Sequence, residues 1–184
     1  MKKVLGIIGS PRRQGNTHIL VERILSGVRE GGGQAEAIFL GDLEIAECIG
    51  CHACWQDKPC PHHDDMEDVI AKIIKSDAIV FGTPVYWYGP TALMKACIDR
   101  FVYFNGGTNR IKIRGKSALL AIPYEEEDPE TAKPVEVFFA KCFDYLEMPL
   151  VGTILAPGVT KRGEIQEKKE LLNRAWEWGK KLAE

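Results

Sequence analysis

Residues 4–20 read VLGIIGSPRRQGNTHIL, and the architecture of the chain can be worked out from this stretch. Val4 to Ile8 form a continuous apolar run, which is typical of a strand buried on both faces of a parallel sheet. Residues 17–29 then carry apolar side chains at helical spacing, and the three glycines at 31–33 end that pattern. A buried strand, a polar loop and an amphipathic helix in succession predict the first unit of an α/β fold.

The loop between this strand and helix, Gly9 to Thr17, has the chemistry of a phosphate site. Ser10, Asn16 and Thr17 offer side-chain donors, and the free N–H groups of a helix start favour an anion. Arg12 either adds positive charge or projects outward. The loop matches neither the dinucleotide fingerprint nor the Walker A motif. The alternative is a plain turn with Asn16 or Thr17 as the helix N-cap, but the position after the first strand favours phosphate.

Strands and helices alternate through the rest of the chain. Further strands are expected at 35–40, 78–82, 117–122 and 148–155, and helices at 66–75, 91–101, 131–146 and 163–184. We expect Asp64 and Asp65 to cap the second helix. The pattern predicts a single domain, residues 1–184, with a five-stranded parallel sheet covered by helices on both faces. Ligands bind such sheets beyond the carboxyl ends of the strands, so the loops after strands one, three and four are the candidates.

Composition narrows the class of protein. The 184 residues are 45% hydrophobic and 27% charged, and the formal net charge is −2. Nothing here favours nucleic acid or a membrane as a partner. The apolar run Val4 to Ile8 is too short for a signal peptide, so we expect a cytoplasmic protein whose thiols stay reduced.

The loop after the third strand reads TPVYWYGP, residues 83–90, and joins three adjacent aromatic residues between two prolines. Exposed aromatic side chains at a ligand-binding edge favour stacking on a flat ring system. The alternative is an apolar loop that covers the sheet end or a subunit interface. Together with a phosphate loop at the same edge, the aromatic residues indicate the two ends of one ligand.

With GSPRRQGNT, TPVYWYGP and the following LMKACIDR, the sequence resembles the flavodoxin-like NAD(P)H-dependent FMN reductases over essentially its whole length. The resemblance implies a three-layer sandwich with strand order 2-1-3-4-5 and a homodimer or homotetramer. It also implies FMN bound with its phosphate at residues 10–17 and its isoalloxazine against Pro84 to Gly89. The loop after strand four, IPYEEEDPET, departs from the glycine-rich loop of several relatives, although Tyr124 there remains a candidate for stacking on the flavin. The candidate FMN-binding residues are Ser10, Arg12, Asn16, Thr17, Pro84, Val85, Tyr86, Trp87, Tyr88, Gly89 and Tyr124.

A second motif is CIGCHACWQDKPC, residues 48–60, which holds four of the six cysteines. In a reducing compartment such crowding indicates a metal or redox site rather than disulfides. The close spacing suits an iron–sulfur cluster. Zinc, with His52, His62 or His63 replacing a thiolate, and an unmetallated loop stay open as alternatives. Cys97 and Cys142 lie on apolar helix faces and are expected to act as small hydrophobic residues.

The run CIGCHACWQDKPCPHHDDM is similar to the cysteine motif of the iron–sulfur flavoproteins, a branch of the same FMN family. That resemblance implies one [4Fe–4S] cluster on Cys48, Cys51, Cys54 and Cys60.

The sequence thus predicts an FMN-dependent oxidoreductase or electron-transfer flavoprotein that needs no catalytic acid or nucleophile, because the flavin carries the chemistry. NAD(P)H or a ferredoxin-type protein is the expected electron donor, with a small molecule or a ferredoxin-type protein as acceptor. Two alternatives remain: an NAD(P)H-dependent FMN or quinone reductase with an unmetallated cysteine loop, and a zinc-stabilised binding module without flavin.

Overall fold

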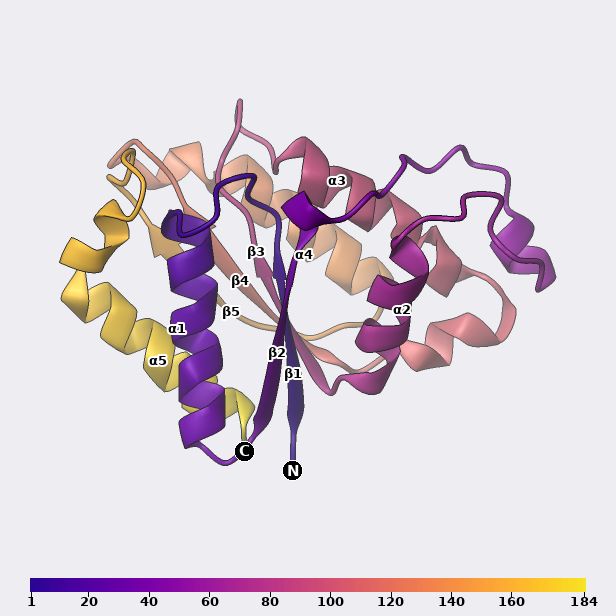
Figure 1. Ribbon diagram of the computed structural model, residues 1–184, viewed down its shortest axis with the longest axis horizontal. Helices are drawn as coiled ribbons and strands as arrows, with labels where there is room; N and C mark the ends of the chain where they lie inside the picture. Colours follow the sequence, from indigo (N-terminus) through magenta and orange to yellow (C-terminus); the bar gives the residue numbers. More distant parts are fainter.

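The computed structural model describes residues 1–184 and contains one five-stranded sheet. All neighbouring strands are parallel, and their order is β2-β1-β3-β4-β5 (Figure 1). The strands are β1 (Lys3–Ile8), β2 (Gln34–Phe39), β3 (Ala78–Gly82), β4 (Ser117–Pro123) and β5 (Leu150–Ala156). The predicted fold and strand order are therefore confirmed. Every residue of the central strand β3 is buried, as expected for a strand covered on both faces.

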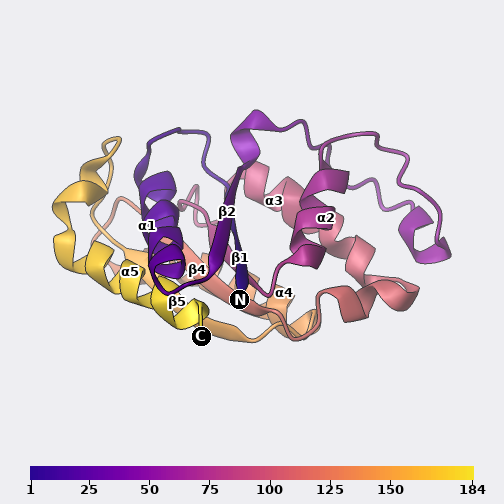
Figure 2. The ribbon, with the colours of Figure 1, turned by 60° about the horizontal axis from the view of Figure 1, so that its bottom comes forward.

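Helices form a layer on each face of the sheet (Figures 1 and 2). On one face lie α1 (Asn16–Glu30) and α5 (Lys169–Leu182); on the other lie α2 (Met66–Lys75), α3 (Ala92–Asp99) and α4 (Lys133–Tyr145). Each layer buries its own apolar cluster against the sheet, with Leu20 and Ile24 on the first face and Phe81 and Phe139 on the second. The helix α1 packs closely against α5 because Gly27 and Gly179 carry no side chain; a Cβ at either position would collide with the opposing backbone.

Some element ends differ from the sequence expectations. The third helix stops at Asp99 and continues as a 3-10 segment, Arg100–Asn105, instead of running to residue 101. The last helix begins at Lys169 rather than at residue 163, because Gly163 has a positive φ and a 3-10 turn, Glu164–Glu167, comes first. Helix capping also differs from the prediction at α2, where only Asp64 bonds the helix start. Its Oδ1 accepts a hydrogen bond from the N–H of Met66 at 3.2 Å, whereas the N-cap Asp65 makes no side-chain cap bond.

The loops after β1 and β3 are bonded to each other at the carboxyl edge of the sheet. Because β1 and β3 are neighbours, the N–H of Gly9 donates to the carbonyl of Gly82 at 2.8 Å. The buried hydroxyl of Thr91 donates to the carbonyl of Gly9, and the N–H of Thr91 donates to Thr83 Oγ1 at 3.2 Å. These bonds fix the loop after β1 against the loop after β3.

No helix in the chain combines the length and the apolar character needed to cross a membrane.

Candidate functional site

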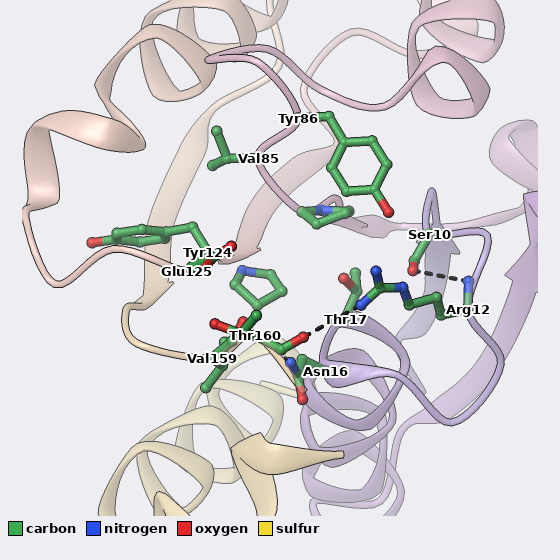
Figure 3. A pocket seen from close by; sticks show the side chains of 12 residues that line it. Ser10, Arg12, Asn16, Thr17, Val85, Tyr86, Tyr124, Glu125, Val159 and Thr160 are labelled. Carbon is green, nitrogen blue, oxygen red and sulfur yellow. Dashed lines mark hydrogen bonds between the residues drawn. The ribbon is translucent and has the colours of Figure 1, made fainter. Parts of the chain in front are cut away.

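A cavity opens at this edge, between the first turn of α1 and the loops after β3, β4 and β5 (Figure 3). It is open to solvent and has a mixed polar and apolar lining. The residues that line it are Ser10, Arg12, Asn16, Thr17, Pro84, Val85, Tyr86, Pro123, Tyr124, Glu125, Val159 and Thr160. Two loops predicted to bind opposite ends of one ligand therefore border the same cavity.

One end of the cavity is suited to an anion. Gly15 precedes α1, so the N–H groups of Asn16, Thr17 and His18 have no partner within the helix. Ser10 and Thr17 are buried beside these groups, and Ser10 Oγ accepts the N–H of Arg12 at 3.2 Å. Backbone donors, hydroxyls and the helix dipole converge here, which is the usual composition of a phosphate site.

Arg12 extends across the cavity rather than away from it. Its Nη1 donates to the carbonyl of Thr160 at 3.3 Å, so the guanidinium joins the loop after β1 to the loop after β5 (Figure 3). A Cβ on Gly15 would lie 2.9 Å from both the Cβ and the carbonyl oxygen of Arg12. The tight turn that places Arg12 thus requires glycine at position 15.

The side chain of Asn16 is bonded to the loop after β5, and its expected contact with FMN stays a prediction. Its Nδ2 donates to the carbonyls of Lys161 at 3.0 Å and Val159 at 3.4 Å, and its Oδ1 accepts the N–H of Ile165 at 3.1 Å. Both ends of the amide are therefore used by the loop after β5. Neither Asn16 nor Thr17 is the N-cap, since that position belongs to Gly15. Asn16 lines the cavity and also holds its far wall in place.

The aromatic loop divides into a part that lines the cavity and a part that does not. Pro84, Val85 and Tyr86 line it. The next residues form a two-residue turn, in which Tyr86 and Gly89 exchange N–H to carbonyl bonds of 2.9 and 3.0 Å. Trp87 and Tyr88 both have positive φ angles in this turn and are 97% and 61% exposed. The turn carries them, together with Gly89, out of the cavity lining, and their expected contact with FMN stays a prediction.

Tyr124 lies at the cavity with its backbone, but its ring points away (Figure 3). The residue is 3% exposed and belongs to the apolar cluster under α4. Burial, followed by the nearby carboxylates of Glu136, Glu127 and Asp128, raises the pKa of its phenol. Its ring therefore packs in the core, and its expected contact with the flavin stays a prediction.

Sequence reasoning missed the wall formed by Val159 and Thr160, as well as Pro123 and Glu125. The loop after β5 was outside the three candidate loops, although its Pro157-Gly158 pair is a turn signal beside the same sheet edge. Because β5 pairs with β4, its carboxyl end necessarily lies close to the loop after β4.

A second cavity lies between the loop that connects β2 to α2, the helix α2 and the 3-10 segment after α3. The loop projects beyond the sheet on the side of α2 and α3 (Figures 1 and 2). All four predicted cysteine ligands line this cavity. The lining comprises Cys48, Ile49, Cys51, His52, Ala53, Cys54, Cys60, Pro61, His62, Ile70, Arg100, Val102 and Tyr103. The thiols share one cavity but do not converge, since no three His, Cys, Asp or Glu side chains are grouped closely enough to hold a metal ion.

The chemistry of the second cavity is suited to a cationic centre among sulfur ligands. Burial, and then the neighbouring Cys48, Cys51 and Cys60, raise the pKa of the Cys54 thiol. Four thiolates here would repel one another unless a positive group lay between them. The Nε2 atom of His62 is buried without any hydrogen-bond partner.

The two cysteines outside the loop behave as expected; Cys97 is fully buried, which raises its pKa to about 12.

Two contacts hold the cysteine loop without any metal. The indole Nε1 of Trp55 donates to the carbonyl of Val102 at 2.9 Å, and a Cβ on Gly106 would lie 2.6 Å from the Cα of Trp55. At the base of the loop, Arg100 forms a buried ion pair with Asp64. Burial opposes the ionisation of Asp64, but hydrogen bonds from Arg100, Ala46 and Met66 outweigh it and lower the pKa of the carboxyl. Arg100 was not among the predicted site residues.

Comparison with known proteins identifies the family to which this chain belongs. The model of the family "NADPH-dependent FMN reductase" matches residues 2–157. An iron–sulfur flavoprotein of Archaeoglobus fulgidus is 30% identical over 184 residues, which cover 99% of this chain and 79% of that protein. Another, from Methanocaldococcus jannaschii, is 43% identical over 98 residues, 53% of this chain and about half (51%) of that protein.

Solved structures share the fold at lower identity. The NAD(P)H:quinone oxidoreductase from Methanothermobacter marburgensis superposes with a TM-score of 0.72 and 20% identity, covering 100% of this chain and 98% of that one. The two chains therefore have the same arrangement of sheet and helices.

Proposed function

Because the chain belongs to the NADPH-dependent FMN reductase family, a family of FMN-dependent oxidoreductases, we propose that its cavity at the carboxyl edge of the sheet binds FMN. The observation that carries the proposal is that both loops line the same cavity. The first turn of α1 forms one end of it, and Pro84 to Tyr86 form another part of its wall. The phosphate would lie against Ser10, Thr17 and the free N–H groups of α1. The isoalloxazine would lie along Pro84, Val85 and Tyr86.

In this site the residues of the chain bind and orient, and no side chain is needed as acid or nucleophile. Bound FMN supplies the redox chemistry, since a flavin accepts two electrons as hydride and can pass them on singly. Arg12 adds positive charge at the phosphate end and links the loops on both sides of it. Asn16 fixes the loop after β5, which closes the cavity opposite the aromatic loop.

We further propose that Cys48, Cys51, Cys54 and Cys60 hold one [4Fe–4S] cluster that exchanges electrons with FMN. Support comes from the four thiols lining one cavity, the unpartnered His62 Nε2 beside them, and relatives named iron–sulfur flavoproteins. Because the thiols do not converge, they would have to turn toward the metal on binding. The cluster would supply one-electron storage. An unmetallated loop remains the second candidate, favoured by this same lack of convergence.

The electron donor would be NAD(P)H or a ferredoxin-type protein, and the whole chain would act as one domain within a homodimer or homotetramer. The first test is anaerobic purification, followed by the visible spectrum and by assay of FMN, iron and acid-labile sulfide per chain. We expect FMN near one per chain, with about four irons and four sulfides. Bleaching of the flavin by NADH, NADPH or reduced ferredoxin then identifies the donor.

Each outcome separates the alternatives. A colourless protein that takes up no FMN on titration would overturn the flavin site. FMN without iron would leave an FMN reductase with an unmetallated loop, and zinc in place of iron would make the loop a structural metal site.

A further inference from the structure

One buried side chain joins the two ends of the cysteine loop. Arg100, directly after α3, is 4% exposed. Its guanidinium donates to both carboxylate oxygens of Asp64, at 2.6 and 3.2 Å, and to the carbonyl of Ala46 at 3.0 Å. Ala46 precedes the first cysteine of the loop and Asp64 follows the last. Asp64 completes the link by accepting the N–H of Ala46 at 2.9 Å. Arg100 therefore clamps the loop at both ends.

The same guanidinium also reaches a cysteine. Its Nη2 lies 3.3 Å from Cys60 Sγ while it donates to Asp64 Oδ1. A planar guanidinium can serve a carboxylate, a carbonyl and a sulfur at once, whereas a lysine ammonium cannot reproduce this fork. No other arginine and no lysine lines the cysteine cavity.

Stability alone is a weak reason for this arrangement. Buried ion pairs gain little over apolar side chains of equal volume, because both charges lose their hydration. A buried guanidinium within hydrogen-bond distance of a cysteine sulfur, however, can act on a group that this sulfur holds. Hydrogen bonds to sulfur and nearby charge are also what set the reduction potential of iron–sulfur groups.

We propose that Arg100 is a positioning residue of the cysteine site. It fixes the ends of the loop 46–64 and places a hydrogen bond and a positive charge at Cys60 Sγ, so that the thiols retain the cluster and hold it at a higher reduction potential. This inference rests on the function proposed above for the cysteine loop.

The test compares Arg100→Gln, Arg100→Lys and the control Arg114→Gln, which removes an exposed arginine paired with Glu147 at 3.0 Å. Three quantities are measured: hydrogen exchange of residues 46–64 in FMN-loaded, iron-free protein; iron and sulfide retained after anaerobic reconstitution; and the reduction potential of the cluster. FMN content reports on the fold of each variant.

For Arg100→Gln we expect roughly tenfold faster exchange in the loop. We also expect about tenfold weaker iron retention, as is typical when a residue supporting metal ligands is lost, and a more negative potential. Arg100→Lys keeps the positive charge but loses the branched set of hydrogen bonds that the guanidinium makes. Its reduction potential should therefore stay near that of the unmodified protein, whereas exchange in the loop should be as fast as in Arg100→Gln. Arg114→Gln should match the unmodified protein in all three.

Unchanged iron retention and potential in Arg100→Gln would overturn the inference, as would an equal shift of potential in both Arg100 variants. If Arg100→Gln also loses FMN, its fold is damaged, and Arg100→Lys decides: either unchanged exchange in the loop or a potential that differs from that of the unmodified protein would then overturn the inference. If the unmodified protein binds no iron, the proposal of a cluster fails. Faster exchange in Arg100→Gln would then show that Arg100 only stabilises the loop, and its positioning role would be overturned as well.

Discussion

The two cavities are built from different parts of the chain. The cavity at the sheet edge is formed at the ends of regular elements: the carboxyl ends of the strands, the first turn of α1 and short loops tied to one another. The cysteine cavity lies in a long irregular connection, and its shape depends on side-chain contacts such as Arg100–Asp64 and Trp55–Val102. Backbone groups at the first site are placed by the fold itself, whereas the thiols of the second are brought close but not into contact. One cavity is thus shaped by regular elements, and the other by contacts between side chains of an irregular loop.

The largest expected effect comes from removing a thiol, which should change iron binding at one cavity and leave FMN binding at the other. Cys51→Ser should abolish iron binding, because a hydroxyl is a poor ligand for a cluster held by thiolates, while FMN per chain stays unchanged. Iron, sulfide and FMN assays on anaerobic protein measure this. Cys142→Ser, at a half-buried cysteine outside the loop, is the matched control and should retain iron. Full iron content in Cys51→Ser would remove Cys51 from the ligand set.

The next comparison lies within the aromatic loop. Tyr86→Ala should weaken FMN binding roughly tenfold, equivalent to about 1.4 kcal/mol, because it removes a ring from the cavity wall. Trp87→Ala should change the FMN affinity by less than about twofold, since its side chain is 97% exposed and outside the lining. Fluorescence titration of apoprotein with FMN measures both constants. Equal losses in the two variants would show that the turn folds over the bound flavin.

A smaller effect is expected from the link between the loops. Asn16→Ala removes three hydrogen bonds to the loop after β5, so the FMN affinity should fall several-fold and the free energy of unfolding by about 1–3 kcal/mol. Urea unfolding of apoprotein and FMN titration measure the two quantities. The control is Asn173→Ala, at an exposed position of α5, which should alter neither. A loss of affinity without a loss of stability would instead assign Asn16 to direct contact with the ligand.

These comparisons also show what the sequence could and could not predict. The parallel sheet was predictable because it depends on local patterns, apolar runs and helix starts, and the family resemblance implied its strand order. The phosphate role of Ser10 and Thr17 stays a prediction. The hydrogen bonds of Asn16 were not predictable, because its partners lie more than 140 residues away in sequence. The exposure of Trp87 depends on two consecutive positive φ angles, which these bulky side chains disfavour and composition alone did not indicate. Arg100 acts through contacts with residues 36 to 54 positions distant.

The smallest expected effect concerns the loop after β5, which Glu164 and Asn16 both hold. Glu164 Oε2 accepts the N–H groups of Thr160 at 2.7 Å and Lys161 at 2.8 Å, and these bonds lower the pKa of the carboxyl from its usual 4.5. A carboxyl whose pKa is lower in the folded protein stabilises the fold above its usual value, and this contribution disappears as the pH falls through the lowered pKa. The difference in Tm between the unmodified apoprotein and Glu164→Gln should therefore be constant from about pH 6 upward and shrink below pH 4.5. Thermal melts at a series of pH values measure it, with Glu177→Gln on the exposed face of α5 as the control. A difference that persists at low pH would mean that Glu164 stabilises the loop through the shape and neutral hydrogen bonds of its side chain rather than through its charge, because both side chains are then uncharged.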